Sequence, residues 1–240
     1  MMSTIRSEIR KSRYQRSTYG LIAGAAAISA ISSMSVIAGS QSPSQAMPLR
    51  LTDEMMMHLV VGATAAGYLF SLILGIITMT SEYRYSTAVA TYLAQPQRRT
   101  VMLAKMLVAC VLGAVLQFLA TAFAMLVSNL YVQRYEHFVL PFDAYTRVMA
   151  GAVLVGAVLG VVGVAVGSLI RSQIIAVMVA ILWLQLVEGL VIVFADWLGK
   201  WSMRGAITSL LDVAVKVRTP QMSFDTTGNL GPWQSALLLL

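Results

Sequence analysis

Glu188 is the residue whose type and position most directly suggest chemistry. It is the one acid deep inside a long apolar segment, 174–195, that has the length of a membrane-spanning helix. A charged side chain at that depth costs at least about 2.5 kcal/mol, so it should face protein or a water-filled cavity. We expect either a cavity-lining or proton-accepting carboxylate, or a glutamate bonded to a neighbouring helix near the membrane interface.

Motifs for catalysis and metal binding are missing from the sequence. It contains no Gly-x-x-x-x-Gly-Lys-Ser/Thr phosphate loop, no Gly-x-Ser-x-Gly elbow and no His-Glu-x-x-His motif. The two histidines have no neighbouring cluster of cysteines or acids. We therefore predict no catalytic residue, no metal ligand and no cofactor bound by this chain. If ATP drives its function, the nucleotide binds elsewhere.

The segment 82–105 is the main polar interruption between two strongly apolar runs. Its charged residues are Glu82, Arg84, Arg98, Arg99 and Lys105. The first half predicts a short helix over 82–93, because helical spacing gathers four side chains on one face, namely Tyr85, Val89, Tyr92 and Leu93. Pro96 ends this helix because it lacks a backbone N–H. A short helix tethered between two spans can dock in a groove of a partner protein.

The composition places the chain in a membrane. Of its 240 residues 58% are hydrophobic and only 11% are charged, whereas soluble domains have about 25% charged residues. The formal net charge is +7, but no basic domain is present that could hold nucleic acid. We therefore expect an all-α membrane protein with the lipid bilayer as a partner and no nucleic acid.

Five apolar runs predict membrane spans, at 18–39, 55–80, 105–131, 148–170 and 174–195. The final run, 233–240, is too short to cross a bilayer, so we expect an incomplete sixth helix. Residues 1–17 predict an amphipathic segment on the membrane surface, and 18–240 form the transmembrane domain. The polar stretch 196–232 predicts an amphipathic helix at the outer interface. Basic residues suited to the membrane surface are Arg10, Lys11, Arg98, Arg99 and Lys105.

Small residues repeat along the fourth span at spacings of three and four. They are Ala152, Gly156, Gly160, Gly163 and Gly167. This spacing lets another helix approach closely. We expect a packing seam within the chain, with a subunit interface as the alternative.

Lys and Arg concentrate on the side of the membrane that holds the amino terminus, which predicts a cytoplasmic amino terminus and a cytoplasmic segment 82–105. The excess of Arg over Lys, with abundant Ala, Val and Gly, indicates a bacterial origin. We therefore expect a multi-pass protein of the bacterial inner membrane.

The polar segment resembles the loop between helices two and three in the permease subunits of type-2 ABC exporters. That family shows a Glu, a Gly-Thr pair, Leu-x-x-Pro-x-Arg-Arg and a Lys. The corresponding residues here are Glu82, Ser86-Thr87, Leu93, Pro96, Arg98-Arg99 and Lys105, with Ser86 standing where the family usually has Gly. The segment IRSEIRKSRYQRST also resembles the family's amphipathic elbow before helix one.

The resemblance implies a six-helix permease half that pairs with a second permease subunit, identical or different. A separate ABC ATPase subunit would hold ATP and Mg and bind the cytoplasmic coupling helix. The residues expected at this coupling site are Glu82, Tyr83, Arg84, Tyr85, Thr87, Val89, Tyr92 and Leu93. The family also implies a substrate cavity between the subunits, lined by helices one, two and five.

The expected cargo is a hydrophobic or amphipathic small molecule, such as a drug or antibiotic, which this chain would move out of the cell. Met56, Met57 and Glu188 are the candidate cavity residues, since methionine surfaces adapt to apolar compounds. Two alternatives remain. One is a membrane scaffold or sensor that holds a cytoplasmic partner without transport, and the other is an ion-coupled carrier that uses Glu188.

Overall fold

A computed structural model describes residues 2–40, 54–85, 93, 97–133, 142–170, 172–187, 218–219 and 222–223. Several expectations lie outside these residues. They concern the coupling-face residues Thr87, Val89 and Tyr92, the carboxylate of Glu188, the amphipathic helix of 196–232 except for four residues, and the short run 233–240.

Helices make up most of the described chain. They are α1 Met2–Tyr14, α2 Arg16–Ser40, α3 Glu54–Ala63, α4 Tyr68–Arg84, α6 Arg98–Val132, α7 Phe142–Leu169 and α8 Gln173–Leu182. A π-helical turn, Trp183–Val187, continues α8. Two short strands, β1 Arg218–Thr219 and β2 Met222–Ser223, pair antiparallel.

Among the described residues, four segments are long and apolar enough to cross a membrane, which makes this a multi-pass membrane protein. They are Arg16–Gly39, Leu59–Arg84, Arg99–Val132 and Tyr145–Leu169. They coincide with the spans expected at 18–39, 55–80, 105–131 and 148–170. The third is longer than expected, because α6 begins at Arg98 and includes the basic residues that precede the apolar run.

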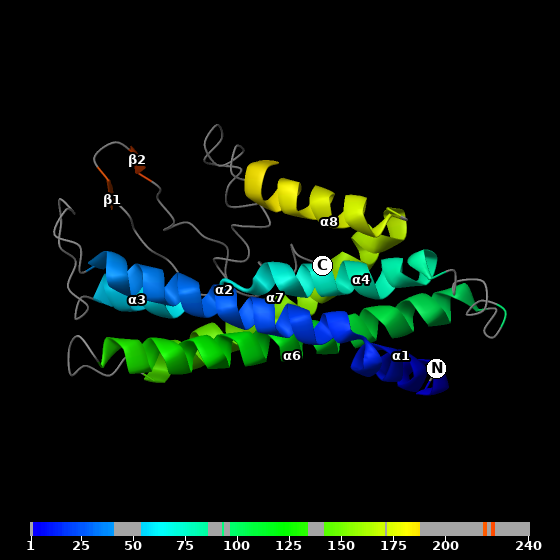
Figure 1. Cartoon of the computed structure of the whole chain (residues 1–240), viewed down its shortest axis with the longest axis horizontal. Coiled ribbons are helices and arrows are strands. Elements are labelled where there is room, and N and C mark those ends of the chain that lie inside the picture. The colour runs from blue at the N-terminus through cyan, green and yellow to red at the C-terminus, as the bar shows by residue number, and fades with distance from the viewer. Residues whose placement is uncertain are drawn as a thin grey trace.

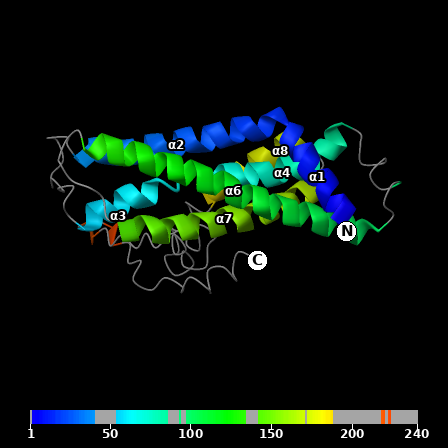
Figure 2. The same cartoon turned by 90° about the horizontal axis from the view of Figure 1, so that it is seen from below.

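The long helices run side by side along the bundle axis (Figures 1 and 2). α4 packs against α6 and α7, and α2 packs against α6. α1 lies at one end of the bundle, beside the start of α6, and α3 lies at the opposite end. The main core joins α4 to α7 through apolar side chains such as Leu72, Ile76, Val155 and Leu159. The two ends of the bundle therefore differ: the short helix α1 lies at one end and the short helix α3 lies at the other.

The small residues of α7 form a seam inside the chain. A Cβ atom added at Gly160 would lie 2.3 Å from the carbonyl oxygen of Ala109 on α6, and one at Gly163 would lie 2.2 Å from that of Leu72 on α4. Both distances are too short for any side chain. The alternative that this face is a subunit interface is therefore wrong, because α4 and α6 of the same chain already cover it.

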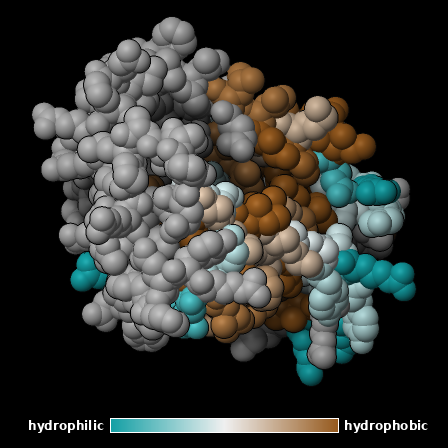
Figure 3. All heavy atoms as spheres, turned by 60° about the vertical axis from the view of Figure 1, so that its left-hand side comes forward, coloured by the Kyte–Doolittle hydropathy of each residue, from teal (hydrophilic) through white to brown (hydrophobic). Residues whose placement is uncertain are grey.

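The outer surface of the bundle is apolar along its length. Exposed large side chains on α6 include Val111, Leu119, Phe123, Leu126 and Leu130. Figure 3 shows a face whose described part is mostly hydrophobic, with hydrophilic side chains gathered at one edge. Such a surface suits lipid rather than water.

Candidate functional site

Four charged side chains meet at the α1 end of the bundle, and we call them the buried ion-pair network. They are Glu8 and Lys11 of α1, Glu82 in the last turn of α4, and Lys105 near the start of α6. The two acids and two lysines balance in charge. Three elements that are distant in sequence are therefore joined by one electrostatic contact.

Each ammonium group in the network contacts both carboxylates. Lys105 Nζ lies 2.9 Å from Glu8 Oε2 and 2.8 Å from Glu82 Oε1. Lys11 Nζ lies 2.8 Å from Glu8 Oε1 and 3.1 Å from Glu82 Oε1. These separations are those of charge-assisted hydrogen bonds, which are stronger than neutral ones. Positive and negative groups therefore alternate among these four described side chains.

Three of the four charged side chains are buried, which makes the ion pairs important for stability. Glu8 is 3% exposed, Glu82 is 5% exposed and Lys105 is 1% exposed, whereas the side chain of Lys11 is half exposed. Taking a charge out of water costs several kcal/mol, and only well-placed counter-charges offset that cost. Each of the three buried charges therefore depends on the others for its stability.

The proton equilibria of α1 reflect this balance. Burial alone would raise the pKa of Glu8, but the ammonium groups of Lys105 and Lys11 outweigh burial, so its pKa lies below the ordinary 4.5. Burial alone would lower the pKa of Lys11, but its hydrogen bonds and charge contacts with Glu8 and Glu82 hold that pKa above 10.5. Both groups are therefore charged at neutral pH.

A sharp connection between helices sets α1 across the bundle. α1 ends at Tyr14 and α2 begins at Arg16, with Gln15 between them. The backbone N–H of Gln15 donates to the carbonyl of Ser12, and that of Thr18 donates to the carbonyl of Gln15. These one-turn bonds keep the joint short. Glu8 and Lys11 lie three residues apart and so share a face of α1, which this joint directs towards α6.

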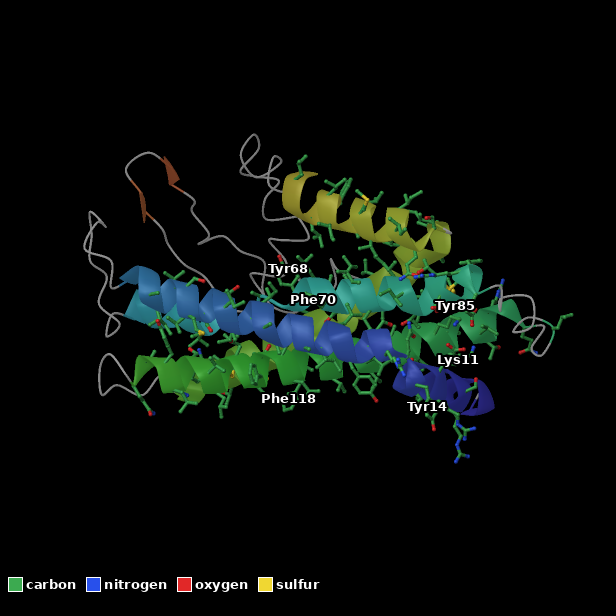
Figure 4. The ribbon with its side chains drawn as sticks, in the orientation of Figure 1. Lys11, Tyr14, Tyr68, Phe70, Tyr85 and Phe118 are labelled. Atoms are coloured by element: carbon green, nitrogen blue, oxygen red, sulfur yellow. The ribbon has the colours of Figure 1, made fainter. Side chains whose placement is uncertain are left out.

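The polar segment that follows α4 begins at the same end of the bundle. Lys11 and Tyr85 both lie there (Figure 4). Tyr85 is 68% exposed and Leu93 is 80% exposed, while Tyr83 is partly buried and packs against the small core cluster of Met79, Ala109 and Val164. The expected coupling side chains thus divide into exposed and packed ones.

Arg84 links the end of α4 to α8. Its guanidinium donates a hydrogen bond to Gln173 Oε1 at 3.3 Å and lies 5.7 Å from the centre of the Tyr85 ring. Both Arg84 and Tyr85 are exposed. A partner that contacts this surface would therefore meet a cationic and aromatic pair held at the junction of two helices.

The structure revises two expectations about charged residues. Lys105 was expected at the membrane surface, but its ammonium is buried between two carboxylates. Glu82 was expected to contact an ATPase, but its carboxylate is buried in the network. The reason is the same for both, since a lysine and a glutamate on neighbouring helices neutralise each other at lower cost than either alone.

Other expected surface residues have mixed positions. Arg10 and Arg99 are exposed, and Lys11 is shared between solvent and the network. Arg98 begins α6. Met56 and Met57 lie in α3, at the end opposite the network, so the structure does not bring them near the coupling residues.

Glu8 is the residue of this candidate site that the sequence alone did not single out. Two signals in the sequence point to it. Glu8 is the sole acid of the basic segment 1–17. Lys105 lies at the start of an apolar span, where a buried lysine needs a carboxylate as its partner. Neither signal identifies the pair alone, because 97 positions separate them.

Within the described residues, no group of three or more His, Cys, Asp or Glu side chains could hold a metal ion. Comparisons of the whole chain with protein-family models, with curated proteins and with solved structures found no match.

Proposed function

We propose that this chain is the membrane-spanning permease subunit of an ATP-driven exporter, with ATP hydrolysed on a separate ABC ATPase chain. The observation that carries the proposal is the buried ion-pair network. It fastens the amphipathic α1 to both helices that flank the polar segment after α4.

The network offers a route for mechanical coupling. A push on the segment 85–97 acts directly on α4 and α6, because that segment joins them. Glu82 and Lys105 carry the displacement to Glu8 and hence to α1. α1 continues into α2 after one residue, so α2 is moved as well. A partner that binds the exposed Arg84, Tyr85 and Leu93 would thus act on three membrane spans together.

The remaining parts of the proposal follow the resemblance of the polar segment to type-2 ABC exporters. The chain pairs with a second permease subunit, spans a bacterial inner membrane and keeps its amino terminus in the cytoplasm. The cargo is a hydrophobic or amphipathic small molecule, which crosses between the two subunits. The apolar lipid-facing bundle supports a cargo that enters from the bilayer.

The test is co-purification of the chain with an ABC ATPase from its own cells, together with ATP-dependent efflux from those cells. Changing Tyr85 and Leu93 to Asp places charge on the exposed coupling surface. The matched control is Tyr14→Asp, which charges a tyrosine that is 80% exposed on α1. We expect the first variant to lose both the ATPase and efflux, and the control to keep the ATPase.

Two results would overturn the proposal. If the Tyr85→Asp/Leu93→Asp variant retains the ATPase and transports normally, the coupling assignment is wrong. If the wild-type chain binds a cytoplasmic partner but no compound stimulates ATP hydrolysis, the chain is a scaffold or sensor rather than a permease.

A further inference from the structure

The second membrane span is interrupted by a turn that lies closer to its start than to its end. The apolar segment Leu59–Arg84 consists of the last part of α3, which ends at Ala63, a turn at 64–67 and α4, which begins at Tyr68. Tyr68 and Phe70 lie partway along the bundle rather than at an end (Figure 4). No proline is present in the turn, so the break needs another cause.

At the turn the backbone N–H groups no longer form the regular hydrogen bonds of an α-helix, and most of them bond to carbonyl groups nearby in the chain. The N–H groups of Thr64, Ala65 and Ala66 donate to carbonyls three residues earlier, at 3.1 to 3.2 Å. This pattern is the tightened winding of a helix end. It leaves the N–H of Gly67 and the carbonyl of Ala65 in need of partners from outside the span.

Two neighbouring helices supply those partners. Ser29 Oγ of α2 accepts a hydrogen bond from the backbone N–H of Gly67 at 2.9 Å. Gln117 Nε2 of α6 donates to the carbonyl oxygen of Ala65, also at 2.9 Å. Ser29 and Gln117 are both fully buried. Inside a membrane no water can replace them, so these two side chains hold the interruption in its present form.

Gly67 also lets α2 approach the turn. A Cβ atom at this position would lie 2.8 Å from Ser29 Oγ and 2.9 Å from the carbonyl oxygen of Ala25. Only glycine leaves that space open. The close contact between α2 and the turn therefore depends on glycine at position 67.

The two halves of the span are held differently. α4 is clamped against α7, since a Cβ atom at Gly75 would lie 2.1 Å from the carbonyl oxygen of Gly160. Its far end is fixed by Glu82 in the buried ion-pair network. α3 instead meets α2 and α7 through side chains such as Val60 and Val61.

Gln117 has a second partner within reach. Its Nε2 lies 3.4 Å from Thr121 Oγ1, one turn further along α6. Its Oε1 has no hydrogen-bond partner among the described residues. The side chain can therefore release Ala65 and keep a hydrogen bond to its own helix, which gives the contact two arrangements.

We propose that residues 64–67 are a hinge about which α3 pivots while α4 stays fixed to α6 and α7. The hydrogen bonds of Ser29 and Gln117 to the turn hold the hinge in the described position, and we call these two residues its latches. The inference goes beyond the proposed permease role and does not depend on it, because it concerns the motion of one half-span.

The test is amide hydrogen exchange of the purified full chain in lipid nanodiscs, followed by mass spectrometry. Ser29→Ala removes the acceptor of the Gly67 N–H. The matched control is Ser33→Ala, which removes an equally buried serine on the same helix, whose hydroxyl donates to the local carbonyl of Ala30. Gln117→Leu removes the second latch without leaving a polar group on the side chain.

We expect Ser29→Ala and Gln117→Leu each to speed exchange in residues 59–67 by about tenfold, because each frees a buried backbone group. Exchange in residues 72–84 should stay unchanged in both variants, and Ser33→Ala should behave as wild type. Two outcomes would overturn the hinge. One is equal acceleration on both sides of the turn, which means loss of general stability, and the other is unchanged exchange in residues 59–67 in both latch variants.

Discussion

Lys105 Nζ and Glu8 Oε2 lie 2.9 Å apart, although 97 positions separate the two residues. Both side chains are almost completely buried, and Glu82 completes the environment of the lysine from a third element. The contact means that α1 is held to the bundle by interior ion pairs as well as by any attraction to the membrane surface. These contacts join α1 to both α4 and α6.

Replacing Lys105 by Met is expected to destabilise the chain strongly. Glu8 and Glu82 would then lose the ammonium group that contacts both of them, and an uncompensated buried charge typically costs ~3–5 kcal/mol. Denaturant unfolding in detergent micelles measures the change in the free energy of unfolding. Arg99→Met is the control, since Arg99 is an exposed basic residue on the same helix and should change stability by less than ~0.5 kcal/mol. Equal effects of the two substitutions would show that the network contributes nothing.

Combining Glu8→Gln with Lys105→Met is expected to restore part of the lost stability. The double variant removes one charge of each sign and keeps the contact between Glu82 and Lys11 at 3.1 Å. A double-mutant cycle over the two sites should give a coupling energy of about 0.5–3 kcal/mol, as for residues in one charge network. Strictly additive effects would contradict the contact between Glu8 and Lys105.

The network also shows what the sequence could and could not predict. The positions of four spans follow from their apolar runs alone, because a bilayer demands long uncharged helices. The pairing of Glu8 with Lys105 could not be predicted in this way, because a charged residue carries no information about where in the chain its partner lies. A lysine at the end of a span therefore suggests the membrane surface, whereas the fold turns Lys105 inward onto α1 and α4.

The interruption at 64–67 escaped sequence reasoning for a related reason. Residues 60–70 read VVGATAAGYLF, which is as apolar as an unbroken span and contains no proline. The break depends on Ser29 and Gln117, which reach it from other helices. The packing face of α7 could be predicted from the sequence, because the spacing of small residues within one helix already defines the face that packs.

The attachment of α1 is expected to persist over a wide pH range and fail at both extremes. The pKa of Glu8 is lower in the folded chain than 4.5, so its stabilising contribution is present above 4.5 and is lost as pH falls through the folded value. The pKa of Lys11 is higher than 10.5, so its contribution is present below 10.5 and is lost as pH rises through the folded value.

Thermal unfolding measured across this range checks the pH dependence. Glu8→Gln should weaken the acid-side loss of stability, because that side chain no longer takes up a proton. The alkaline side should keep the contribution of Lys11 through Glu82. A wild-type chain that becomes more stable as pH drops below 4.5 would contradict the assignment.

Substituting alanine for Gly160 is expected to disrupt the contact between α7 and α6. The added methyl group would lie 2.3 Å from the carbonyl oxygen of Ala109, and backbone atoms cannot move aside without shifting a helix. Overpacking of this kind typically costs about 1–3 kcal/mol. Gly20→Ala is the matched control, since a Cβ atom there meets nothing within 4 Å, and alanine favours the helix by about 1 kcal/mol. Unfolding measurements should therefore show opposite signs for the two substitutions, and a neutral or stabilising Gly160→Ala would mean that α6 and α7 pack less closely than described.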